Sequence, residues 1–123
     1  MKSYTDLEQS KKLAEILPIK SADMTWEQVT NALTKDFTWK PTMGLDKAIA
    51  DNLFSYRNGY VLPCYSLAAL LDYIKDKCGY FELVYINSTN VYRLSTNIYD
   101  VHNKELVDAC YEMVLKLHEQ KLL

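Results

Sequence analysis

The sequence predicts a small α+β domain, in which one antiparallel sheet of two to four strands packs with about four helices. Segments 80–86 and 91–98 show the period of two of a sheet covered on one face, because Phe81, Leu83 and Tyr85 take alternate positions in the first, and Tyr92, Leu94 and Thr96 in the second. Apolar residues recur at helical spacing in several other segments. Because a two-stranded hairpin is only marginally stable alone, we expect helices to cover it.

Length and composition favour a single domain over residues 1–123. The 123 residues are 49% hydrophobic and 24% charged, which is enough to form one core. The longest apolar run, Leu67 to Leu71, has five residues, against roughly 18 for a spanning helix, so we expect no membrane segment. No export signal is visible at the N-terminus, and the three cysteines include no CxxC pair. These features predict a cytoplasmic protein without disulfides.

The first expected element is a helix over residues 5–17. Thr5 and Glu8 have the spacing of a capping box at its start. Pro18 should end the helix, because the residue before a proline avoids the helical region.

Residues 22–40 allow two interpretations. Thr25 and Gln28 have capping-box spacing, which favours a helix. Alternating apolar positions instead favour a pair of strands. Those positions are Met24, Trp26, Phe37 and Trp39. Short periodic runs do not decide between the two, so both remain open.

A second helix is expected over residues 44–56, followed by a turn at 57–59. Pro63 suits the first turn of a further helix, which should run to about Lys77. Gly79 should end that helix by adopting a positive φ.

The hairpin at 80–98 is expected to turn at residues 87–90. A last helix follows from about Lys104 to Lys121, with Asn103 as its cap. Its apolar stripe consists of Val107, Cys110, Val114 and Leu117.

Charge and composition argue against several classes of function. The chain has 14 basic and 16 acidic residues, and only two of the basic residues are arginine, so we do not expect a nucleic-acid partner. No cysteine or histidine spacing suits a metal, and no glycine-rich loop is present, so we expect no metal and no cofactor. Tyrosine is abundant and unevenly distributed, because nine of the ten tyrosines lie between Tyr56 and Tyr111.

Catalytic candidates are few, and we expect no enzyme activity. Cys64 would follow Pro63 in the first turn of a helix, where a thiol pKa is lowered, so a thiol enzyme centred on Cys64 is an alternative. Glu105, Asp108 and Glu112 share one face of the last helix, and we expect that face to be solvated.

The tyrosines favour a protein interface. If the alternation of the hairpin holds, Tyr80, Arg93 and Tyr99 lie opposite the core, and Tyr with Arg often anchors a contact. The predicted function is a non-enzymatic interaction module that binds a protein partner or itself, and a sheet edge can pair with a second copy. The rival is a weak single-stranded nucleic-acid binder that stacks bases on exposed tyrosines.

Three segments together resemble a family of small uncharacterised proteins carried by prophages and mobile elements of gut bacteria. They are YTDLEQSKKLAEILPIKSADM at 4–24, LPCYSLAALL at 62–71 and VDACYEMVLKLHEQKLL at 107–123. The family often has Trp where this chain has Tyr65. The resemblance implies a phage-linked origin and a bacterial cytoplasm, and it supplies no activity.

Overall fold

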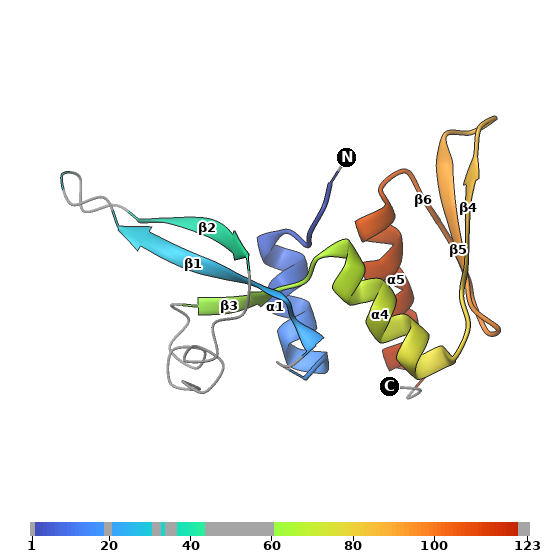
Figure 1. The fold of residues 1–123 in the computed structure, drawn as a ribbon, viewed down its shortest axis with the longest axis horizontal. Helices are drawn as coiled ribbons and strands as arrows, with labels where there is room; N and C mark the ends of the chain where they lie inside the picture. The colour runs from blue at the N-terminus through green and yellow to red at the C-terminus, as the bar shows by residue number, and fades with distance from the viewer. Residues whose placement is uncertain (1, 19–20, 31–32, 34–36, 44–60, 121–123) are drawn as a thin grey trace. The chain divides into compact units, whose positions relative to one another are not determined.

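The computed structural model describes residues 2–18, 21–30, 33, 37–43 and 61–120, which form the helices and strands of Figure 1. The chain divides into two compact units. The terminal unit joins Met1–Thr5 to Ser66–Leu123, and the central unit is Asp6–Tyr65. The described residues contain two three-stranded antiparallel sheets and three helices, so the α+β class is confirmed and the count of about four helices is slightly too high for these residues. The prediction of one domain over 1–123 stays a prediction.

The central unit begins with helix α1, Leu7–Ile16, whose cap lies one residue later than predicted. The Asp6 side chain accepts a hydrogen bond from the Gln9 backbone at 2.8 Å, and the Gln9 side chain accepts one from the Asp6 backbone at 3.1 Å. This capping box replaces the predicted pair of Thr5 and Glu8. Leu17 is extended, as expected for a residue before Pro18.

Strands, not a helix, follow α1. β1 (Met24–Thr30) lies between β2 (Phe37–Met43) and β3 (Val61–Cys64) in an antiparallel sheet of order β2-β1-β3. The two-strand interpretation of this region is therefore confirmed. Trp26 Nε1 donates a hydrogen bond to Ser10 Oγ at 3.0 Å, which joins β1 to α1. The predicted helix at 44–56 and the turn at 57–59 lie outside the described residues.

Pro63 lies in strand β3, so its predicted place in the first turn of a helix is wrong. Among the described strands, β3 stands at an edge of its sheet, where a proline is tolerated. Helix α4, Leu67–Cys78, begins after Ser66. The Ser66 side chain accepts a hydrogen bond from the Ala69 backbone N–H at 3.1 Å. Gly79 ends α4 with φ 72°, as predicted.

The terminal unit contains the second sheet. β4 (Glu82–Ile86) and β5 (Val91–Ser95) form the predicted hairpin, and β6 (Asp100–Asn103) pairs with β5 to give the order β4-β5-β6. Three strands lie within the predicted two to four, but β6 was not among the predicted segments, and the single predicted sheet is in fact two. Tyr85 pairs with Tyr92 and Leu83 with Leu94, so these four side chains share one face.

Helix α5, Leu106–Glu119, packs against β5, β6 and α4 (Figure 1). The predicted apolar stripe of α5 is confirmed as core, because each of its residues is buried: Val107, Cys110, Val114 and Leu117. Asn103 is not the cap. Glu105 holds the cap position, and the Asn103 side chain accepts a hydrogen bond from the Glu105 backbone at 2.9 Å. Within the described ranges, every helix is too short or too polar to span a bilayer.

Candidate interaction surface

Strand β4 is the least covered strand of the terminal unit. Four of its five residues are exposed and the fifth is half-buried. Leu83, Val84 and Tyr85 are 38%, 36% and 48% exposed, whereas Leu94, the partner of Leu83 on β5, is fully buried. Leu83 and Tyr85 are exposed because α5 packs against β5 and β6 and leaves β4 farther out (Figure 1).

β4 presents apolar side chains on both faces of its sheet. Leu83 and Tyr85 point to the side of the sheet that α5 covers, and Val84 points to the opposite side. The Tyr85 and Tyr92 rings lie 5.0 Å apart at 49°, and the Tyr85 hydroxyl donates a hydrogen bond to Asn90 Oδ1 at 3.0 Å. Although Tyr85 points to the side that α5 covers, it is 48% exposed.

Tyr80 and Arg93 belong to a polar group on the side of the sheet away from α5. The Tyr80 hydroxyl donates to Glu82 Oε2 at 2.9 Å. Arg93 Nε donates to Ser95 Oγ at 3.1 Å and lies 3.8 Å from Asp100 Oδ1. The hydrogen bond to Glu82 and the charge of that carboxylate raise the pKa of Tyr80, while the charge of Arg93 lowers it in part. The Tyr80 hydroxyl and the Arg93 Nε–H are thus each engaged with a polar side chain of the same unit.

Tyr99 does not join this polar group. Its ring lies 5.8 Å from Lys116 Nζ, a cation–π contact with helix α5. Because α5 covers the opposite face of the sheet, the structure places the Tyr99 ring away from the face that Tyr80 and Arg93 share. The alternation of the hairpin did not extend through the turn that carries Tyr99.

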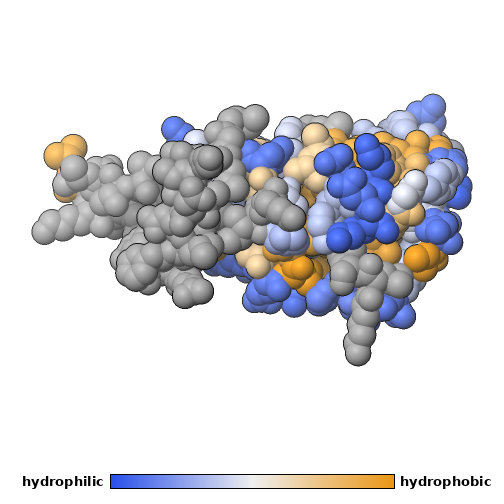
Figure 2. Space-filling model, turned by 60° about the horizontal axis from the view of Figure 1, so that its bottom comes forward, coloured by the Kyte–Doolittle hydropathy of each residue, from blue (hydrophilic) through white to orange (hydrophobic). Residues whose placement is uncertain are grey.

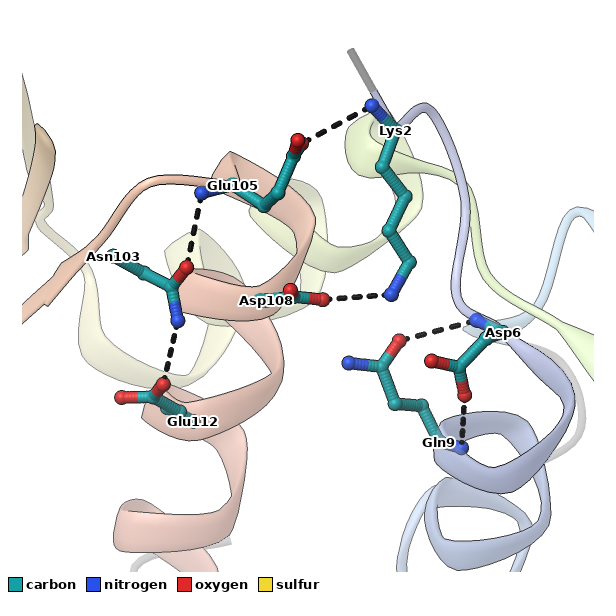
Figure 3. Close-up of polar contacts among 7 residues, drawn as sticks. All are labelled: Lys2, Asp6, Gln9, Asn103, Glu105, Asp108 and Glu112. Atoms are coloured by element: carbon teal, nitrogen blue, oxygen red, sulfur yellow. Dashed lines mark hydrogen bonds and ion pairs between the residues drawn. The ribbon is translucent and has the colours of Figure 1, made fainter. Parts of the chain in front are cut away.

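The carboxylates on the acidic face of α5 make hydrogen bonds and an ion pair with other parts of the unit. Glu105 Oε2 accepts a hydrogen bond from the Lys2 backbone at 3.1 Å, and Lys2 Nζ lies 2.7 Å from Asp108 Oδ1 (Figure 3). Glu112 Oε1 accepts from Asn103 Nδ2 at 2.7 Å. The three carboxylates are half-buried, so the expectation of a solvated face is wrong. They hold the N-terminal segment and the end of β6 against the helix.

We expect Lys2→Met to lower the free energy of unfolding by about 0.5–1 kcal/mol at low salt, with a smaller loss at about 1 M NaCl. The reason is that Lys2 and Asp108 are each largely covered, at 26% and 30% side-chain exposure. Urea unfolding at both salt concentrations measures the effect. The control is Lys11→Met, whose 3.7 Å pair with Glu8 is well exposed and should contribute nothing measurable.

Cys64 is fully buried in strand β3, where it pairs with Met24. Its predicted position at a helix N-terminus is wrong. The helix therefore gives no physical reason to expect a reactive thiol at Cys64. Cys110 is also buried, and burial raises the pKa of its thiol to about 12. Across the described ranges, no three His, Cys, Asp or Glu side chains gather closely enough to hold a metal ion.

Sequence reasoning placed Tyr80 and Arg93 near one another but missed the β4 edge. A signal was present, because residues 83–86 are four consecutive apolar residues inside an alternating hairpin. On the face that Figure 2 presents, hydrophobic groups of the described residues are interspersed with hydrophilic ones.

A scan against protein-family models, a search of curated proteins and a search of solved structures each found no match to this chain. The resemblance to prophage proteins therefore stays a prediction, and the functional argument rests on the surface of the terminal unit.

Proposed function

We propose that this chain is a non-enzymatic protein-interaction module that binds its partner through strand β4. The observation that supports the proposal is the combination of an open strand edge with exposed apolar side chains. Leu83, Val84 and Tyr85 are consecutive, and all three are exposed on a strand with high β propensity. A partner that pairs with β4 gains backbone hydrogen bonds and covers these side chains in one step.

Charge favours a protein over a nucleic acid as the partner. Arg93 is the cation of the polar group beside β4, and it already contacts Ser95 and Asp100. Glu82, at the start of β4, brings a negative charge to the same face. A phosphate backbone approaching this strand would meet the Glu82 carboxylate and an arginine already 3.8 Å from the Asp100 carboxylate, in a chain of net charge −2.

The wider role that we propose is that of an accessory protein of a phage or mobile element, acting in a bacterial cytoplasm. This part of the proposal rests on the resemblance at 4–24, 62–71 and 107–123 and on the three cysteines without CxxC spacing. Partner binding fits an accessory role because it needs none of the catalytic groups that the sequence lacks.

Site-specific photo-cross-linking tests the proposed surface. With p-benzoylphenylalanine at position 84, irradiation of cells of the source organism should yield an adduct with protein, because the probe replaces Val84 on the exposed strand. The matched control places the probe at Asp72 of α4, which has 70% side-chain exposure in the same unit and should give no adduct. Equal adducts at both positions, none at position 84, or an adduct with nucleic acid there would each contradict the proposal.

A further inference from the structure

We propose that the partner of β4 is a second copy of this chain, paired antiparallel edge to edge about a two-fold axis at Val84. This inference rests on the proposed function and names the partner. The result would be one continuous six-stranded sheet, because each copy contributes a sheet of order β4-β5-β6 and β4 meets β4 at the centre. The interface is isologous, so each residue of β4 must suit its counterpart in the other copy.

The edge of β4 lacks several of the devices that usually prevent such pairing. Edge strands are commonly protected by proline, lysine, a bulge or a covering helix. β4 has the sequence ELVYI, which contains neither proline nor lysine. Its ladder with β5 runs without interruption from Glu82 to Ile86, so the strand has no bulge. Among the residues that the structure describes, β4 has a strand neighbour only on its β5 side.

One antiparallel register pairs all five residues of β4, and that register is centred on Val84. Val84 then faces Val84, Leu83 faces Tyr85 of the other copy, and Glu82 faces Ile86. Cross-strand pairs of an aromatic with an aliphatic residue stabilise sheets. In every shifted register, part of β4 has no partner in the other strand or lies opposite the turn at 87–90 of the other copy.

Charge supports the same register. Glu82 is the carboxylate of β4, and it stands at the first position of the strand. With Val84 at the centre, the two Glu82 residues are four residue steps apart, or about 13 Å along the strands. A register centred on Glu82 would set the two carboxylates directly opposite each other, which is destabilising.

The second copy also covers the side chains that α5 leaves exposed. The two-fold axis is perpendicular to the sheet, so both α5 helices lie on the same side of it. Leu83 and Tyr85 of each copy point to that side, and α5 packs against β5 and β6. In the dimer, these four half-exposed side chains would pack on one another between the two helices.

The test is sedimentation equilibrium of the full chain from about 5 to 500 µM. Because the contact is confined to one five-residue strand of each copy, we expect a monomer–dimer equilibrium with Kd of about 10–100 µM. Val84→Lys and Val84→Glu should each weaken the dimer at least about tenfold, because each places like charges opposite each other. An equimolar mixture of the two variants should recover dimers, since Lys then faces Glu.

Val84→Thr is the control, because it keeps a neutral β-branched residue and should dimerise with Kd within a few-fold of the original. Circular dichroism of each variant checks that the fold is kept. A chain that stays monomeric at 500 µM overturns this inference, while cross-links at position 84 to another protein would leave the proposed function intact. A dimer that Val84→Lys does not weaken, or a mixture that recovers no dimer, overturns the register centred on Val84.

Discussion

Leu94→Ala is expected to lower the free energy of unfolding of the terminal unit by about 2–5 kcal/mol. Leu94 is fully buried on the central strand β5, on the face against which α5 packs. Truncation removes the burial of its side chain from water and leaves a cavity that the surrounding strands and helix only partly fill. Urea unfolding followed by circular dichroism measures the loss. For a domain of this size it is a large part of the total stability.

Leu83→Ala is the matched control, because Leu83 is the cross-strand partner of Leu94 and differs from it mainly in exposure. We expect it to cost less than about 1 kcal/mol. The comparison is made at about 1 µM chain, below the expected Kd for self-association. Similar losses for the two variants would contradict the arrangement in which α5 covers β5 and leaves β4 open.

The three cysteines are expected to differ strongly in their reaction with iodoacetamide. Cys110 should react roughly 1000-fold more slowly at pH 8 than in the unfolded chain. The reason is that burial raises the pKa of its thiol from 9.0 to about 12, which lowers the thiolate fraction by about that factor. Cys64 is also fully buried and should be protected, whereas the half-buried Cys78 should be labelled first. Mass spectrometry of digested samples gives the rate at each site.

The control is the same reaction in 6 M guanidinium, where all three thiols should react at similar rates. Cys78→Ser should leave the folded chain unlabelled over the time in which Cys78 reacts. Faster labelling of Cys64 in the folded chain than in guanidinium would contradict its burial in β3 and would restore the thiol-enzyme alternative.

Local sequence signals predicted the elements whose causes are local. Pro18 ends α1 and Gly79 ends α4, because a proline restricts the residue before it and a glycine adopts the positive φ of 72°. The hairpin and the buried stripe of α5 followed from periods of two and 3.6. The N-cap of α1 did not follow from the sequence, because Thr5 and Asp6 both suit that position. The hydrogen bond that the Asp6 side chain accepts from the Gln9 backbone identifies Asp6 as the cap.

The sequence predicted one face for Tyr80, Arg93 and Tyr99 but not the β4 surface, and the interface role of these three residues stays a prediction. The pairing pattern of the hairpin was enough to place Tyr80 and Arg93 on one face. In the structure, Tyr80 bonds to Glu82, Arg93 bonds to Ser95, and Glu82 and Ser95 are partners across the two strands. Tyr99 follows β5 in a turn, where a period-two pattern no longer applies, and its ring lies at Lys116. The predicted helix start at Pro63 was wrong because proline suits both the first turn of a helix and an edge strand.

By itself the sequence determined the α+β class, the hairpin at 80–98, the buried face of α5 and the ends of two helices, because these depend on neighbours within a few residues. Only the tertiary structure decided that the strands form two sheets, that β6 completes the second sheet, and that Cys64 is a buried strand residue. It also decided which strand stays open. Leu83 and Leu94 have the same side chain and the same face, but Leu94 lies on the central strand under α5, whereas Leu83 lies on the outer strand, which α5 leaves open.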